Sequence, residues 1–347
     1  MGDQADSIYD PSHRYRRCEQ ISQDGVKTIY RALDQQEGTV VRWNEIPFDG
    51  APTSRFQQLL ADIKTIGNFE SPHVLKLLFA WVDRNQKLII FITEFFTEQT
   101  IRSYTNTVVH DPPASVISNW VYQILEGLLD LHSLNPPFSH RDLRCDKIFI
   151  DPAEGIVKIG VPAFEFQLSE TLPPIAAPEA QQRLIDPKSD VWSVGLCVVE
   201  MATQAIPYSE LGTPAAQRKA VLDKIMPQAL SQVSDPNVAD FIATCLQPYD
   251  LRPTISQLME HSLILDFRQV PDSGRDKSQP DSGRDKSQSN NNIDLRQSPQ
   301  FLELLAKQKK EKEDLEMAQK QARHNLRVKL STKKRSLREL LSSVSQN

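Results

Sequence analysis

The first third of the chain carries the apolar and polar pattern that is typical of β-strands. Four runs are rich in β-branched and aromatic residues and are separated by Gly, Asp and Asn, namely residues 26–33, 38–46, 74–83 and 87–95. Between the second and third runs, residues 53–69 place apolar side chains at helical spacing. These side chains are Phe56, Leu59, Leu60, Ile63 and Ile66. The pattern predicts a small antiparallel sheet with one helix packed on it.

After Thr100 the apolar periodicity becomes mostly helical. Four segments follow the period of an amphipathic helix: residues 115–134, 189–204, 215–226 and 238–247. A sheet with one helix, followed by a helical region, predicts an α+β fold of two lobes. We assign the small antiparallel lobe to residues 15–96 and the helical lobe to residues 97–267, and we expect residues 1–14 to be a flexible N-terminus.

The chain changes character after residue 267. The sequence PDSGRDKSQ occurs twice in tandem, and residues 268–298 are too poor in apolar side chains to fold, so we predict a disordered linker. Residues 299–347 have the composition of a helix, and residues 307–339 hold 12 basic and 5 acidic residues. Leu330, Leu337 and Val344 recur every seven residues. A solvated charged helix and a coiled coil or partner helix, which could support self-association, both remain open.

Composition restricts the partners and the compartment. The net charge of −5 gives no reason to expect nucleic acid as a partner, and the four cysteines are too far apart for a CxxC metal or redox pair. The longest apolar run, residues 88–92, is far shorter than the roughly 20 residues of a transmembrane helix. We therefore expect a cytoplasmic protein without a transmembrane segment.

The second half of the chain contains an ordered series of short motifs. Residues 140–150 read HRDLRCDKIFI, and VKIG, AAPE, SDVWSVG and LRPT follow in that order. A protein kinase needs these parts in this order, because phosphoryl transfer depends on positioning and on neutralising phosphate charge. Over residues 15–267 the chain resembles the WNK branch of protein kinases and the related nuclear-receptor-binding-protein pseudokinases. The segments KTIYRALDQQEG, VRWNEI, FITEFFTEQTIRSY and IPYSE carry the closer resemblance.

The resemblance implies a degenerate nucleotide pocket. Ser22, Asp24 and Lys27 occupy the positions at which a kinase has the glycines that admit phosphate, and an aspartate there would repel a triphosphate. Asn44 replaces the usual lysine of the third strand. WNK kinases supply that charge from the glycine-rich loop instead, which matches Lys27. An exposed lysine on a hairpin is the alternative for Lys27.

Two further pocket positions follow from the resemblance. Asp62 stands where the glutamate of the small-lobe helix would pair with the lysine, and it is one methylene shorter. Thr93 lies in the last strand of the small lobe, next to the connection between the lobes.

The two magnesium positions of a kinase are changed. The catalytic-loop asparagine corresponds to Lys147, and the aspartate of the DFG motif corresponds to Val161. An ammonium group and an alkyl group cannot coordinate Mg²⁺, which prefers oxygen ligands. No metal is therefore expected at these positions.

The remaining kinase positions are compatible with a structural role. The resemblance implies that His140 and Arg141 order the catalytic loop, that Asp190 caps the backbone of that loop, and that Glu179 and Arg252 form an ion pair in the helical lobe. Asp142 occupies the position of the catalytic base, which accepts the proton of the substrate hydroxyl. Without a metal-bound phosphate nearby, this base would have nothing to transfer.

These residues favour a catalytically impaired pseudokinase that acts as a scaffold or allosteric regulator. An atypical serine/threonine kinase that uses Lys27 and Asp142 is the main alternative, and a switch that binds ATP without Mg²⁺ is a third. We expect no obligatory cofactor. Signalling proteins are the expected partners, bound through the kinase-like lobes or the basic tail.

Overall fold

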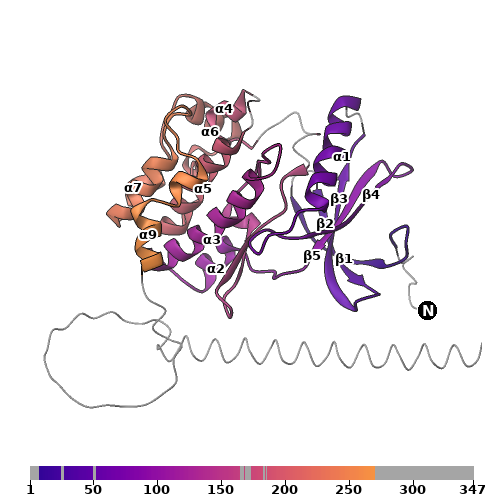
Figure 1. Cartoon of the computed structure of the whole chain (residues 1–347). Coiled ribbons are helices and arrows are strands. Elements are labelled where there is room, and N and C mark those ends of the chain that lie inside the picture. The colour runs from indigo at the N-terminus through magenta and orange to yellow at the C-terminus, as the bar shows by residue number, and fades with distance from the viewer. Residues whose placement is uncertain are drawn as a thin grey trace, which may run out of the picture. The chain divides into compact units, whose positions relative to one another are not determined.

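The small lobe is a five-stranded antiparallel sheet covered by one helix (Figure 1). The structure is a computed structural model that describes residues 8–24, 27–49, 52–164, 168, 173–182, 184 and 186–269. The strands run in the order β1-β2-β3-β5-β4, and their bounds are β1 Tyr15–Asp24, β2 Lys27–Asp34, β3 Thr39–Pro47, β4 Leu77–Asp83 and β5 Leu88–Glu94. Helix α1 spans Thr53–Gly67 and buries three of the apolar side chains that its spacing predicted to be internal, Leu59, Ile63 and Ile66, whereas Leu60 is exposed.

The helical lobe follows from Ile101 (Figure 1). Its helices are α2 Ile101–Thr107, α3 Ala114–His132, α4 Pro178–Gln181, α5 Pro187–Thr203, α6 Pro214–Leu222, α7 Pro236–Cys245, α8 Ile255–Leu258 and α9 Ser262–Gln269. A two-stranded antiparallel sheet, formed by β6 Ile148–Asp151 and β7 Ile156–Ile159, lies beside α3. The α+β class and the division into a sheet lobe and a helical lobe are thus confirmed.

The core of the helical lobe forms around α3 and α5, which are in contact with each other. Both helices bury most of their length, and α5 also packs on α7 at a position where only glycine fits. A Cβ atom added to Gly195 of α5 would lie 2.7 Å from the Cβ atom of Cys245. Helix α5 begins after Asp186, whose side chain caps it by accepting a hydrogen bond from the Lys188 amide (2.7 Å), and Pro187 occupies the first turn.

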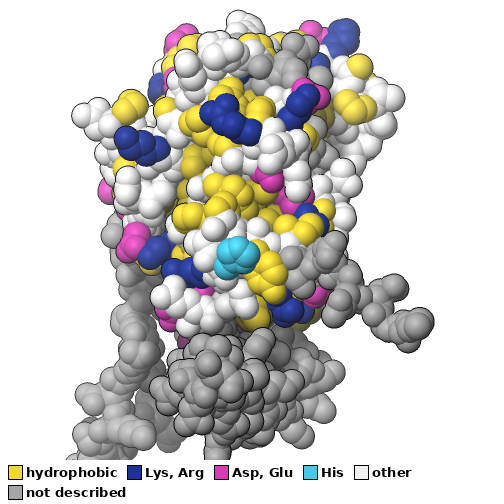
Figure 2. Space-filling view, turned by 90° about the vertical axis from the view of Figure 1, so that its right-hand side faces the viewer, with side chains coloured by type: hydrophobic (Ala, Val, Ile, Leu, Met, Phe, Trp, Pro, Cys, Tyr) yellow, Lys and Arg dark blue, Asp and Glu magenta, His cyan; other side chains and the backbone are white. Residues whose placement is uncertain are grey.

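The sheet of the small lobe has two apolar faces. One face contributes to the main core, and the other forms a smaller cluster around Trp43, whose ring packs edge-on against Trp81 at a centroid distance of 4.8 Å. Figure 2 views the molecule from the side of the small lobe and shows apolar side chains gathered there between Lys and Arg side chains. The exposed large apolar residues of this lobe include Tyr9, Leu60, Leu78 and Phe79.

The observed elements extend the expected ones at a few points. Strand β1 begins at Tyr15, well before the first predicted run, and α9 continues to Gln269, past the predicted end of the domain at residue 267. Within the described part of the chain, no helix combines the length and the hydropathy needed to cross a bilayer. The predicted linker at residues 268–298 and the tail at residues 299–347 lie almost entirely outside the described residues and stay predictions.

Candidate functional site

A cavity of about 610 Å³ lies between the sheet of the small lobe and the catalytic loop of the helical lobe. Its wall contains most of the pocket positions inferred from the sequence. These are Ser22, Asp24, Lys27, Asn44, Thr93, Lys147 and Val161. The fold therefore brings together, from both lobes, residues that are more than a hundred positions apart in the chain.

Lys27 points into this cavity and is buried, with 7% of its surface exposed. It is the first residue of β2 and pairs in register with Asp24, the last residue of β1, so that its Nζ atom lies 3.9 Å from Asp24 Oδ2. The alternative of an exposed hairpin lysine is wrong. Its predicted pairing with Asp62 stays a prediction.

Asp24 is surrounded by cations. Besides Lys27, the Nζ atom of Lys147 lies 2.8 Å from Asp24 Oδ2, and Arg144 Nη2 lies 3.3 Å from Asp24 Oδ1. Partial burial raises the pKa of the Asp24 carboxyl, but these cations outweigh burial and hold the pKa below its usual value. The tip of the small-lobe hairpin is thus tied electrostatically to the catalytic loop of the helical lobe.

Asn44 and Asp62 use their side chains within the protein. The Asn44 amide donates hydrogen bonds to the carbonyl oxygens of Phe91 (3.3 Å) and Arg42 (3.5 Å). The Asp62 carboxylate accepts a hydrogen bond from Gln58 (3.0 Å) and forms an ion pair with Arg141 of the HRD motif. Asp62 consequently links the small-lobe helix α1 to the catalytic loop.

The two positions that correspond to magnesium ligands lie next to each other. The Gly160 amide donates a 2.8 Å hydrogen bond to the Lys147 carbonyl, which places Val161 beside Lys147 at the cavity wall. Val161 packs against the apolar core, and the Lys147 ammonium is held by carboxylates. The residues present do not fit Mg²⁺, because neither side chain offers an oxygen. Among the residues that the structure describes, no group of three His, Cys, Asp or Glu side chains is arranged to hold a metal.

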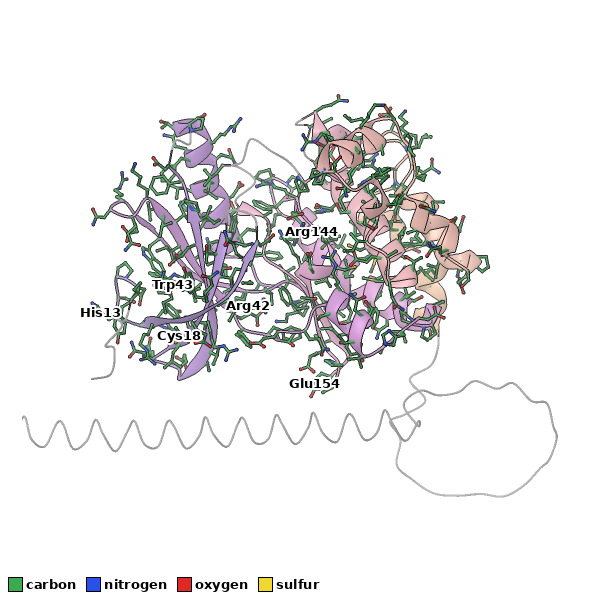
Figure 3. The ribbon with its side chains drawn as sticks, turned by 180° about the vertical axis from the view of Figure 1, so that it is seen from behind. His13, Cys18, Arg42, Trp43, Arg144 and Glu154 are labelled. Carbon is green, nitrogen blue, oxygen red and sulfur yellow. The ribbon has the colours of Figure 1, made fainter. Side chains whose placement is uncertain are left out.

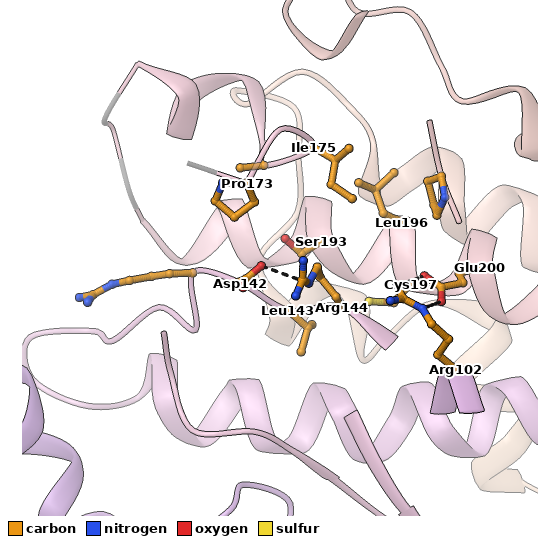
Figure 4. A pocket seen from close by; sticks show the side chains of 13 residues that line it. Arg102, Asp142, Leu143, Arg144, Pro173, Ile175, Ser193, Leu196, Cys197 and Glu200 are labelled. Carbon is orange, nitrogen blue, oxygen red and sulfur yellow. Dashed lines mark hydrogen bonds and ion pairs between the residues drawn. The ribbon is translucent and has the colours of Figure 1, made fainter. Parts of the chain in front are cut away.

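Asp142, at the position of the catalytic base, forms ion pairs with two cations. Its carboxylate forms an ion pair with Lys147, and Arg144 Nε lies 3.5 Å from Asp142 Oδ1 (Figure 4). Burial raises the pKa of the Asp142 carboxyl, but Lys147 and Arg144 outweigh burial and lower it. A carboxylate with a lowered pKa is a weaker proton acceptor.

Two arginines at the site were not singled out from the sequence. Arg144 forms ion pairs with both Asp24 and Asp142, and its position two residues after Asp142 in the catalytic loop was the available signal. Arg42 also lines the cavity. Alternate residues of a strand share a face, so the position of Asn44 in the pocket already implied that Arg42 faces it too. Arg42 and Trp43 lie on opposite sides of the sheet, as Figure 3 shows.

Arg102 closes the other side of the catalytic loop. A narrow space of about 30 Å³ lies there, lined in part by Asp142, Arg144 and Arg102 (Figure 4). Arg102 Nη1 lies 2.6 Å from Asp146 Oδ2, and its Nη2 atom donates a 3.0 Å hydrogen bond to Glu200. The acidic groups of this space are therefore already neutralised by arginine.

The positions expected to brace the fold make the contacts expected of them. The Asp190 carboxylate accepts hydrogen bonds from the backbone amides of His140 (2.7 Å) and Arg141 (3.0 Å). Arg252 Nη1 lies 2.5 Å from Glu179 Oε1, and both residues are buried. These contacts require no ligand.

Comparison with known proteins agrees with this geometry. The protein kinase domain family matches residues 15–264. The serine/threonine-protein kinase WNK8 of Arabidopsis thaliana is 35% identical over 279 residues, which cover 78% of this chain and 48% of that protein. The probable serine/threonine-protein kinase WNK6 of Oryza sativa subsp. japonica is 34% identical over 266 residues, which cover 72% of this chain and 60% of that protein.

The chain spans about half the length of the relatives it matches, as the probable kinase WNK10 of Arabidopsis thaliana also shows, with 35% identity over 50% of its length. The matched part of the chain is the part that forms the two lobes and the cavity between them. The chain therefore belongs to the protein kinase domain family and is related to the WNK serine/threonine kinases.

Proposed function

We propose that this chain is a pseudokinase of the WNK branch that acts as a protein-interaction scaffold or allosteric regulator in signalling. One observation carries the proposal. The ammonium group of Lys147, at the position of a magnesium ligand, forms ion pairs with both Asp142 and Asp24.

This arrangement removes two requirements of phosphoryl transfer at once. Metal ions must bridge the β- and γ-phosphates, and a base must accept the proton of the substrate hydroxyl. Lys147 and Val161 supply no metal ligand, and Asp142 is engaged by Lys147 and has a lowered pKa. A single ion pair thus occupies both the metal position and the base.

The scaffold part of the proposal rests on what the domain keeps. Buried contacts such as Glu179 with Arg252 hold the helical lobe together. A lobe held together by such internal contacts is compatible with a scaffold, because its fold does not depend on a ligand. We propose signalling proteins as the partners, with the lobes or residues 299–347 as the binding parts and self-association of those residues as a further route. A cytoplasmic location remains part of the proposal.

An active serine/threonine kinase of WNK type is the second candidate, because Lys27 is buried and directed into the cavity. Transfer of labelled γ-phosphate to a generic basic substrate separates the two. We expect the wild-type chain to transfer no more phosphate than an Asp142→Ala variant. Transfer that requires Mg²⁺ and is lost in Asp142→Ala would establish the kinase instead.

The interaction role needs a separate experiment. Affinity capture with the full chain, with Asp142→Ala and with a variant that lacks residues 268–347 shows which part binds. We expect the full chain and Asp142→Ala to retain the same proteins. Partners that depend on Asp142 would contradict a scaffold, and partners lost only on deletion would assign recognition to the tail.

A further inference from the structure

Arg42 occupies the end of the cavity that adjoins the connection between the lobes. Its guanidinium carbon lies 4.2 Å from the ring centroid of Phe149 and 5.3 Å from that of Phe95. Its Nη2 atom donates a hydrogen bond to the Thr97 carbonyl in that connection. A flat, delocalised group is thus stacked on aromatic rings and bonded to the backbone at its edge.

These contacts are the ones that a nucleobase makes in a protein. Bases stack on aromatic side chains and are read at their edges by hydrogen bonds. A guanidinium is also planar and presents its donors in its own plane. Arg42 therefore makes both contacts from within the chain: it stacks on the Phe149 ring and donates a hydrogen bond to the Thr97 carbonyl. It is 7% exposed, and burial lowers its pKa to about 10 although Glu98 opposes the shift.

Asp24 plays the corresponding part at the other end of the cavity. Its two carboxylate oxygens lie 2.8 Å from Lys147 Nζ and 3.3 Å from Arg144 Nη2. Lys27 lies 3.9 Å away on the same hairpin. An oxyanion among three cations is what a phosphate group would provide, and here the chain supplies it.

We propose that the cleft is occupied by the protein's own side chains, with Arg42 in place of a nucleobase and Asp24 in place of the phosphates of a purine nucleoside polyphosphate. The inference rests on the proposed function, because it assigns the same cleft. Both residues belong to the small lobe, and Phe149, Arg144 and Lys147 belong to the helical lobe. The contacts therefore join the lobes without a nucleotide.

The size of the cavity is not the obstacle to a nucleotide. A volume of about 610 Å³ is within the range of pockets that hold small molecules. A nucleotide must instead displace Arg42 from Phe149 and bring phosphates to a site that already holds the Asp24 carboxylate, and like charges in contact are strongly unfavourable. Substitution of Arg42 should therefore affect binding of the nucleobase, and substitution of Asp24 should affect binding of the phosphates.

The test uses each half of the ligand on the full chain in EDTA, by isothermal titration calorimetry. The probes are inorganic triphosphate and adenosine, and the variants are Asp24→Asn and Arg42→Ala. We expect Asp24→Asn to bind triphosphate about tenfold or more tightly than wild type, with no gain for adenosine. We expect Arg42→Ala to gain adenosine and not triphosphate, and the double variant to bind ATP without Mg²⁺.

Asp49→Asn and Arg84→Ala are matched controls, because both side chains are exposed on the small lobe away from the cavity. Arg42→Met keeps the bulk of the side chain if Arg42→Ala does not fold, and circular dichroism checks each variant. The inference is overturned if the folded variants bind the half-ligands no better than wild type. A wild-type chain that hydrolyses Mg·ATP, or that transfers its γ-phosphate, would overturn the proposed function as well. A wild-type chain without this activity, together with variants that bind no half-ligand, would overturn the inference alone.

Discussion

Lys147 of the catalytic loop lies 2.8 Å from Asp24 of the small-lobe hairpin, measured from Nζ to Oδ2. The two residues are 123 positions apart in the chain. In a kinase, metal-bound phosphates stand between the glycine-rich loop and the catalytic loop. Here a direct ion pair spans that gap, and the same ammonium group also holds Asp142. Residues at the positions of a kinase active site thus pair with one another and join the two lobes.

Replacing Lys147 with methionine tests how far the fold depends on this ion pair. The change removes one of the two cations that pair with both Asp142 and Asp24 and leaves Arg144 as the other, so we expect the free energy of unfolding to fall by about 1–3 kcal/mol. Urea denaturation at neutral pH measures the loss. Lys219→Met is the control, because the Lys219 side chain is 77% exposed and pairs with Asp223 on the surface. This substitution should change the free energy of unfolding by less than about 0.5 kcal/mol.

Wild type and Lys147→Met should also differ in how their stability depends on acidic pH. The pKa values of Asp24 and Asp142 are lowered in the folded chain from an ordinary value of 3.8. Their contribution to stability is therefore complete above that pH and is lost as the pH falls further. The difference between wild type and Lys147→Met should shrink below pH 3.8. A difference that stays constant into strong acid would show that Lys147 acts through packing instead of charge.

His140 gives a second pH dependence, at a higher pH. Its ring is fully buried, its Nε2 atom donates a 3.1 Å hydrogen bond to the Gly160 carbonyl, and burial lowers its pKa from the ordinary 6.5. Stability from the neutral ring is complete above pH 6.5 and falls as the pH drops below it, by at most about 1.4 kcal/mol per pH unit. Unfolding free energies of wild type and His140→Gln between neutral and mildly acidic pH measure this slope. Equal slopes in the two chains would contradict it.

The sequence predicted the elements that depend on local pattern. Helix α1 spans Thr53–Gly67, inside the segment 53–69 whose apolar spacing predicted it, and β3 and β5 form where two of the predicted strand runs lie. The resemblance to kinases, and not the pattern, placed Asn44 and Thr93 in a nucleotide cleft, and both residues line the cavity. The sequence could not reveal that Arg42 lies over Phe149, because that contact depends on how the two lobes meet.

The repulsion between Asp24 and phosphate stays a prediction, and the sequence did not indicate the cations that surround this carboxylate. Its partners Arg144 and Lys147 come from the other lobe, and no short-range pattern places them beside a hairpin in the first thirty residues. The most informative clue was strand periodicity, which puts Arg42 on the same face as Asn44. Ion pairs between distant parts of the chain have no sequence period, so they could not be predicted from the sequence.

Gly127 tests the packing of α3 against the chain that leads into β4. A Cβ atom at this position would lie 2.8 Å from the backbone carbonyl oxygen of His73, which cannot move away as a flexible side chain would. We expect Gly127→Ala to destabilise the domain by about 1–3 kcal/mol. Gly67→Ala, in α1, meets nothing within 4 Å and should leave stability unchanged or raise it by up to about 1 kcal/mol. Thermal denaturation of both variants checks the contrast, and an equal effect would contradict it.

The buried ion pair of Glu179 and Arg252 predicts strongly coupled substitutions. Arg252→Met leaves the Glu179 carboxylate buried without its cation, which should cost about 3–5 kcal/mol. Adding Glu179→Leu removes that lone charge and should recover part of the loss. A double-mutant cycle by urea denaturation measures the coupling. Simple additivity of the two changes would show that the pair does not act as a unit.

We propose that this cleft does not hold a metal-bound triphosphate, because Lys147 and Val161 stand at the positions of the two metal ligands. Isothermal titration calorimetry of ATP into the wild-type chain, once in Mg²⁺ and once in EDTA, compares the two affinities. We expect Mg²⁺ not to tighten ATP binding. Tighter binding of ATP in Mg²⁺ than in EDTA would contradict it.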